Sequence, residues 1–135
     1  MIKLSKMTDY AVVILAEMAA RDGALVSASD LSVQSKLPEP TVAKVLKSLG
    51  KHNIVLSHRG VRGGYSLNKP AAEINMAAVV TALDGPIALT ACVEESAECC
   101  SYGENCKIKG HWNPVNLAMH KVLEDVSLDQ MIGHS

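Results

Sequence analysis

The sequence predicts a mostly α-helical fold, and three observations favour it. The chain has 135 residues, of which 48% are hydrophobic, so it is long enough for one domain with a sizeable core. Phe is absent and there is only one Trp. The core must therefore be built from Leu, Ile, Val, Met and Ala, which favours packed helices over a β-sandwich. Apolar residues also recur at helical spacing in several segments.

Two helices are expected in the first part of the chain. The first, from Tyr10 to Ala20, is almost wholly apolar and should be buried on most of its faces, with Ser5 or Thr8 as its N-cap. Ser27 can cap the second helix. This helix should end before Pro38, because the residue that precedes a proline disfavours the helical conformation.

A third helix is expected to begin at Pro40, since a missing N–H costs nothing at the first helical position. Its two faces differ in chemistry. Apolar residues recur on one face at helical spacing: Val42, Val45, Leu46 and Leu49. The other face carries hydroxyls and cations without an acidic partner in the helix: Thr41, Lys44, Lys47, Ser48 and Lys51.

The charge of this region differs from that of the whole chain. No Asp or Glu occurs between Pro40 and Ala72, whereas the net charge of the protein is only -1. The cations in that stretch are Lys44, Lys47, Lys51, Arg59, Arg62 and Lys69. A local basic surface in a neutral chain favours phosphate binding, and a solvated positive face is the alternative interpretation of the charge alone.

A β-hairpin should follow the third helix. Ile54 and Leu56 alternate with polar residues, as do Tyr65 and Leu67, and the residues between them are rich in glycine. Two helices joined by a turn and followed by a basic hairpin form a winged helix-turn-helix. One helix fits the major groove of DNA, and an Arg on a flexible arm can reach the minor groove. The candidate DNA contacts are Thr41, Lys44, Lys47, Ser57, Arg59 and Arg62.

Two further helices are expected after the hairpin. Asn75 can cap a connector helix from Met76 to Leu83, which we expect to pack on the hairpin. A long C-terminal helix starts near Trp112, and its apolar residues form a narrow stripe: Trp112, Val115, Met119, Val122 and Val126. Such a stripe favours a seam between two copies of the chain, so we expect a dimerisation helix. Ser127 should start a short final helix.

All four cysteines lie in one acidic segment without clean periodicity: Cys92, Cys99, Cys100 and Cys106. In a reducing compartment such a group is more often metal-binding or reactive than disulfide-bonded. Gaps of six, zero and five residues separate them, whereas structural zinc sites use pairs two to four residues apart. An iron-sulfur cluster tolerates wider loops, so it is favoured over zinc and over incidental buried thiols.

The expected organisation is a DNA-binding domain over 1–72, a connector helix over 73–90, a cysteine segment over 91–111 and a dimerisation helix with its tail over 112–135. Three motifs carry a resemblance that spans nearly the whole chain: KLSKMTDYA at 3–11, PTVAKVLKSL at 40–49 and SHRGVRGGYSL at 57–67. With the cysteines and the Trp that follows them, the chain resembles the IscR-type family of winged helix-turn-helix repressors. Its greatest likeness is to the branch that regulates the SUF iron-sulfur assembly operon.

The resemblance implies roles for particular residues. Arg59 would enter the minor groove, and Arg62 would contact phosphate or the groove a second time. Relatives can carry a base-contacting acid where this chain has Ala43, so the operator sequence of those relatives does not transfer. By resemblance, three cysteines match the family's cluster ligands: Cys92, Cys100 and Cys106.

The fourth cluster ligand stays open. Cys99 is an additional cysteine, and the position of a possible His ligand in the family is occupied here by Lys109, whose ammonium cannot bind iron. Cys99, His111 or a Glu of the segment are the candidates. A [2Fe-2S] cluster is preferred over [4Fe-4S].

The expected function is that of a homodimeric, cytoplasmic repressor of iron-sulfur assembly genes that binds a double-stranded DNA operator and senses through its cluster. A cluster-free regulator with a zinc or thiol redox segment is the alternative. No CxxC, nucleotide-binding Gly loop or Ser-His-Asp pattern supports an enzyme with a small-molecule substrate. The N-terminus lacks the pattern of a signal peptide, and no apolar stretch reaches the roughly 18 to 20 residues that span a membrane.

Overall fold

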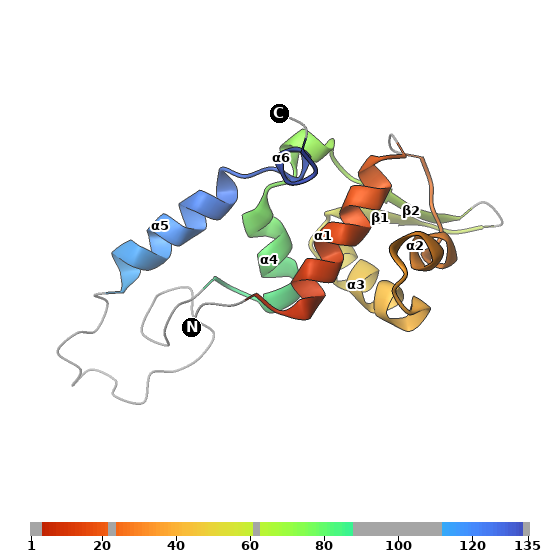
Figure 1. Ribbon diagram of the computed structural model, residues 1–135, viewed down its shortest axis with the longest axis horizontal. Coiled ribbons are helices and arrows are strands. Elements are labelled where there is room, and N and C mark those ends of the chain that lie inside the picture. Colours follow the sequence, from red (N-terminus) through yellow and green to blue (C-terminus); the bar gives the residue numbers. More distant parts are fainter. Residues whose placement is uncertain (1–3, 22–23, 61–62, 88–111, 134–135) are drawn as a thin grey trace.

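The computed structural model describes residues 4–21, 24–60, 63–87 and 112–133. A helical body with a two-stranded hairpin forms one end of the molecule, and a helix extends from it toward the other end (Figure 1). In chain order the elements are α1 (Lys6–Ala19), α2 (Ala28–Ser35), α3 (Glu39–Lys51), β1 (Val55–His58), β2 (Gly64–Leu67), η1 (Ala71–Glu73), α4 (Met76–Asp84), α5 (Asn113–Glu124) and α6 (Leu128–Met131). Among the residues described, no helix is long and apolar enough to cross a membrane. The predicted mostly α-helical winged helix-turn-helix is confirmed.

The helix-turn-helix consists of α2 and α3, which pack against each other and against α1. The predicted buried face of α3 is confirmed, because its four apolar residues are each 0% exposed: Val42, Val45, Leu46 and Leu49. The helix starts at Glu39, one residue earlier than predicted, and Pro40 occupies its second position. Pro40 still lies in the first turn, where backbone N–H groups have no partner within the helix.

Four helices begin at a side chain that accepts a hydrogen bond from the backbone N–H three residues further on. The capping distances are 3.3 Å for Ser5, 3.0 Å for Ser27, 2.9 Å for Asn75 and 3.2 Å for Ser127. Each such cap stabilises its helix by about 1 kcal/mol. The sequence prediction of these caps is confirmed, with Ser5 rather than Thr8 preceding α1.

The hairpin is anchored to the body through a third segment of backbone. β1 and β2 pair antiparallel, from Val55 opposite Leu67 to His58 opposite Gly64. On the other edge of β2, Val26 N donates to Tyr65 O at 2.9 Å and Tyr65 N donates to Val26 O at 2.7 Å. The second strand of the hairpin is therefore tied, close to the turn, to the residues that lead into α2.

The structure differs from the sequence prediction in the packing of α4. This helix packs mainly against α1, α3 and α5 instead of the hairpin. Met76 and Val79 join the main core, whereas Ala77 and Val80 form a second cluster with Ile87. Because α4 is apolar on more than one face, its periodicity did not indicate which neighbours it covers.

A buried hydrogen bond ties α5 to the segment that follows α4. The side chain of Asn116 is 0% exposed, and its Nδ2 donates to the carbonyl oxygen of Ile87 at 2.8 Å. Residues 88–111 connect these two points along the chain. The bond therefore holds together the described flanks of the cysteine segment.

Asp84, the last residue of α4, is bound by the first turn of α1. Its Oδ2 accepts hydrogen bonds from Thr8 Oγ1 at 2.8 Å and from Ser5 N at 3.2 Å. Partial burial opposes ionisation of Asp84, but the hydrogen bonds from Ser5 and Thr8 outweigh it, and the pKa of Asp84 is lowered from 3.8. The carboxylate also lies at the positive end of α1, where a negative charge is favourable.

We expect Asp84→Asn to lower the free energy of unfolding by about 1 kcal/mol at neutral pH, because hydrogen bonds to a charged, partly exposed acceptor are weakened. A lowered folded-state pKa gives stability that is present above the unfolded value of 3.8 and lost as pH falls through the folded value. The difference in the free energy of unfolding between wild type and Asp84→Asn should therefore disappear as the pH is lowered. Urea unfolding across this pH range measures it.

Asp9→Asn is the matched control. Asp9 lies in the first turn of α1, the turn that binds Asp84, and the Asp9 carboxylate itself makes no side-chain hydrogen bond within the described ranges. A gap for Asp84→Asn that stays constant down to the acid limit would contradict the assigned role of its charge.

Candidate nucleic-acid interface

The exposed face of α3 carries the predicted cations. Ala43, Lys44 and Lys47 are exposed, Thr41 is half-buried, and Lys51 is exposed at the end of the helix. Salt bridges in the part of the chain that the structure describes involve only α5, where His120 pairs with Glu124 and Lys121 with Asp125. The α3 lysines thus present their ammonium groups to solvent without a carboxylate partner there, which suits them to bind phosphate.

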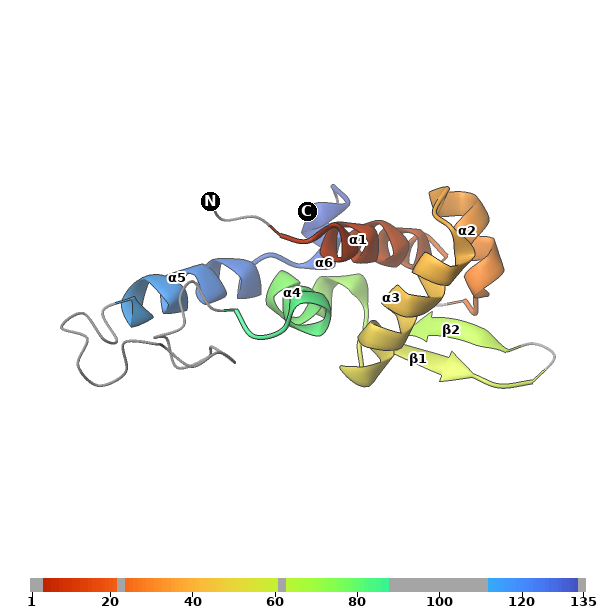
Figure 2. The same ribbon diagram turned by 90° about the horizontal axis from the view of Figure 1, so that it is seen from below.

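The hairpin continues this basic surface. Figure 2 shows α3 next to the hairpin, whose strands β1 and β2 point away from the body. Ser57 and Arg59 are exposed at the end of β1 and just beyond it. Arg62 lies outside the described residues. A groove-sized helix beside a projecting arm has the geometry to place one element in the major groove and the other along the backbone or in the minor groove.

A hydrogen bond across the two strands supports the arm. His58 Nε2 lies 2.9 Å from Ser66 Oγ, and Ser66 is only 9% exposed. Because His58 directly precedes Arg59 in the chain, this contact fixes the backbone that leads into the basic tip.

The hairpin requires glycine where its two strands meet the turn. A Cβ on Gly64 would lie 2.7 Å from the carbonyl oxygen of Val26, and a Cβ on Gly63 would lie 2.9 Å from Gly60 O and closer still to His58 O. Gly60 itself has a φ of 110°, a conformation that L residues rarely adopt. The backbone therefore approaches itself more closely here than any side chain allows.

We expect Gly64→Ala to destabilise the protein by about 1 to 3 kcal/mol, because the new methyl group meets backbone atoms of Val26 and must displace the strand. Thermal unfolding measures the effect. Gly50→Ala is the control, since a Cβ there meets nothing within 4 Å and alanine raises helix propensity by roughly 0.8 to 1 kcal/mol. Equal unfolding midpoints for the two variants would contradict the close approach at Gly64.

One contact at this surface was not predicted from the sequence. Ser29 Oγ, near the start of α2, donates to Oε1 of Glu39, the first residue of α3, at 3.0 Å. Ten positions separate the two residues along the chain, so no spacing rule connects them. The turn between the helices brings them together.

The predicted metal ligands all lie outside the described residues: Cys92, Cys99, Cys100, Cys106 and His111. Among those described, no group of three or more His, Cys, Asp or Glu side chains could hold a metal ion.

The predicted stripe on the C-terminal helix is split by the structure. Trp112, Val115 and Val122 are 42%, 46% and 63% exposed, whereas Met119 and Val126 are half-buried. Val126 packs against the main core. The apolar surface that α5 leaves open thus consists of Trp112, Val115 and Val122, together with Leu117, which is 58% exposed.

The sequence matches known regulators over nearly its whole length. The model of the Rrf2 family, described as an iron-dependent transcriptional regulator, matches residues 4–134. The HTH-type transcriptional regulator NsrR of Oceanobacillus iheyensis is 30% identical over 130 residues, which cover 96% of this chain and 88% of that protein. The HTH-type transcriptional regulator IscR of Yersinia enterocolitica is 28% identical over 134 residues, which cover 98% of this chain and 80% of that protein.

Solved structures share the fold. CymR, the global cysteine regulator of B. subtilis, superimposes with a TM-score of 0.73 at 24% identity, covering 100% of this chain and 99% of that chain. T. potens IscR superimposes with a TM-score of 0.65 at 22% identity, covering 97% of this chain and 86% of that chain. The family match and the sequence relatives identify a transcriptional regulator and not an enzyme. With its helix-turn-helix and two-stranded wing, this chain belongs to the Rrf2 family of transcriptional regulators.

Proposed function

We propose that the protein is a homodimeric repressor of iron-sulfur cluster assembly genes, of the SUF-regulating type, and that it acts in the cytoplasm. The observation that carries the DNA-binding part is the exposed row of lysines on α3 beside the wing, which have no carboxylate partner among the residues that the structure describes. In each protomer Thr41, Lys44 and Lys47 would face the major groove. Ser57, Arg59 and Arg62 would contact the backbone or the minor groove.

Dimerisation would place two such surfaces on one operator. The exposed apolar residues of α5 support this, because a solvent-facing row of Trp112, Val115 and Val122 is covered when two copies pair. Two-fold symmetry then sets the spacing between the half-sites.

The proposed sensor is the cysteine segment. Thiolates are the donors that iron-sulfur clusters require, and Cys92, Cys100 and Cys106 supply three of them, with Cys99 or His111 as the fourth ligand. The family description as iron-dependent is consistent with such a cofactor. When bound, a [2Fe-2S] cluster would make the protein responsive to iron supply and oxidants.

The chain's own residues would link this segment to the DNA-binding half. Asn116 holds α5 to Ile87, and Leu123 packs against the cluster that includes Val80 on α4. Since α4 in turn contacts α1 and α3, a change in the flanks of the cysteine segment can reach the recognition helix through packed side chains.

A cluster-free regulator is the second candidate, because the gaps between the cysteines do not exclude a thiol sensor or an irregular zinc site. Purification without oxygen, followed by iron, sulfide and zinc analysis, separates the two. Iron and sulfide in equal amounts with visible absorption bands support the cluster. A colourless protein with stoichiometric zinc, or without metal, would refute it.

We expect Cys92→Ala to abolish iron incorporation, because only two of the three proposed thiolate ligands remain. Operator affinity should change with the loss of the cluster. Cys99→Ala and His111→Ala are the comparison pair: the one that loses iron identifies the fourth ligand. Iron analysis and duplex binding by fluorescence anisotropy give both readouts. Unchanged operator affinity of anaerobically purified Cys92→Ala would refute the cluster as a switch.

A further inference from the structure

We propose that Glu39 determines DNA specificity by accepting a hydrogen bond from the N4 amino group of a cytosine in the major groove, with Ser29 as its positioning residue. The inference rests on the proposed DNA-binding surface, and it concerns residues that are neither cations nor part of the wing.

The position of Glu39 on the recognition helix favours a base contact. It is the first residue of α3 and is exposed, and in helix-turn-helix proteins the N-terminal residues of the recognition helix face the base edges. One turn further along the same face lies Ala43, which is also exposed. The methyl side chain of Ala43 leaves the carboxylate room to reach a base.

The hydrogen-bond inventory of Glu39 leaves it with spare acceptor capacity. Ser29 Oγ donates to Oε1 at 3.0 Å. For Oε2, no donor and no cation within salt-bridge distance is found within the described ranges. A carboxylate has about four acceptor sites, so one oxygen is held by α2 while the other stays available to an incoming donor.

The electrostatics of the surface make this carboxylate selective. Glu39 directly precedes the acid-free stretch that begins at Pro40, so it is the acidic group closest to Lys44 and Lys47 along α3. Close to phosphates a carboxylate is repelled, and it lowers affinity for any duplex unless a donor faces it. Its presence thus disfavours DNA without the matching base.

Cytosine is the base that fits best. Its major-groove edge offers the N4 amino donor, whereas guanine presents the acceptors N7 and O6 and thymine presents the acceptor O4. Adenine offers a donor at N6 but places the acceptor N7 beside it. A carboxylate is therefore attracted to cytosine and repelled, wholly or partly, by the other three bases.

A helix-stabilising role is the competing explanation, because an acid in the first turn interacts favourably with the helix dipole. That role predicts a lower unfolding midpoint for Glu39 variants and an unchanged base preference. The two explanations therefore differ in whether Glu39 variants change the unfolding midpoint or the base preference.

The test is selection from a random-sequence duplex library by the full-length wild type, by Glu39→Ala and by Glu39→Gln. The wild type should enrich cytosine at one symmetric position, and replacing it by thymine should weaken binding about tenfold. Glu39→Ala should lose that preference and bind a non-specific duplex more tightly. Glu39→Gln should shift the preference to adenine, since the Gln amide matches adenine N6 and N7.

Two further variants complete the experiment. Ser29→Ala should reduce the discrimination between cytosine and thymine without lowering duplex affinity overall. Glu73→Gln, which removes the same charge from η1, should leave the selected sequence unchanged. Retention of the wild-type base preference by both Glu39 variants would overturn the proposal. If the wild type retains no duplex at all, the DNA-binding surface itself is refuted.

Discussion

Replacing Lys44 and Lys47 together by alanine is expected to weaken binding to any duplex by on the order of a hundredfold at about 0.1 M salt. Both side chains are exposed on α3 and have no carboxylate partner in the described part of the chain. In a dimer the double variant removes four phosphate contacts. The slope of log affinity against log salt should therefore fall by about four, which titrations at several salt concentrations measure.

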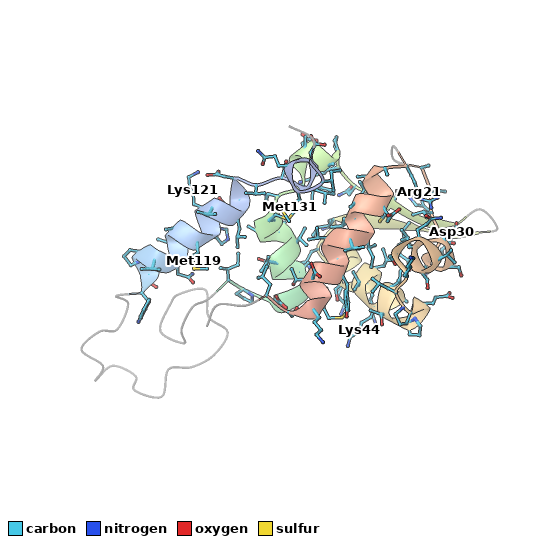
Figure 3. All side chains as sticks on the ribbon, viewed as in Figure 1. Arg21, Asp30, Lys44, Met119, Lys121 and Met131 are labelled. Carbon is cyan, nitrogen blue, oxygen red and sulfur yellow. The ribbon has the colours of Figure 1, made fainter. Side chains whose placement is uncertain are left out.

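Lys121→Ala is the matched control. Figure 3 shows Lys44 on α3 and Lys121 on α5, toward the other end of the molecule. Lys121 is also exposed, but it is paired with Asp125 at 3.3 Å. This variant lowers the net charge by one unit and should leave the salt slope unchanged. If Lys121→Ala altered the slope as much per lysine as the double variant did, overall charge and not the α3 surface would account for binding.

Much of the DNA-binding half could be predicted from the sequence, because local rules govern it. Apolar residues at helical spacing predicted the buried face of α3. Ser27 and Asn75 marked helix starts, because hydroxyl and amide side chains are preferred as caps. The glycines and alternating residues after α3 indicated the hairpin.

Contacts between distant segments could not be predicted in the same way. The pairing of Val26 with Tyr65 joins residues 39 positions apart, by subtraction of their numbers, and nothing in either local sequence marks it. For the same reason the predicted packing of α4 was wrong. Val79 and Val80 both face apolar neighbours, so periodicity did not indicate which side of α4 packs against which element.

The same distinction between local patterns and distant contacts applies to the candidate site. The lysines of α3 were found from charge, and their exposure agrees with that prediction. Glu39 was overlooked because it lies just before the acid-free stretch, and its partner Ser29 is brought near only by the turn between α2 and α3. Arg62 and the proposed cluster ligands stay predictions.

The exposed row on α5 leads to the second large expected effect. Val115 and Val122 are seven residues apart, the repeat of a two-helix seam, and they are 46% and 63% exposed in the single chain. Asn116 and Leu123 lie about 100° round the helix from this row, because an α-helix has 3.6 residues per turn, and they bind or pack toward Ile87 and α4. The row of Val115 and Val122 is therefore exposed and available to pair with a second copy.

We expect Val115→Glu with Val122→Glu to raise the dissociation constant of the dimer by at least about a hundredfold, because uncompensated carboxylates are then buried in an apolar seam. Light scattering coupled to size-exclusion chromatography should show a monomer at concentrations where the wild type is dimeric. Duplex affinity should fall with it, since the two recognition helices are no longer linked.

Val33→Glu on α2 makes the same chemical change at a side chain that is 74% exposed, so it controls for added negative charge and for loss of an exposed valine. It should leave the dimer intact. Thermal unfolding of both variants separates dissociation from misfolding, because the mutated valines of α5 are not part of the core clusters. A folded double variant that stays dimeric would place the interface elsewhere on the molecule and remove α5 from the proposed arrangement of half-sites.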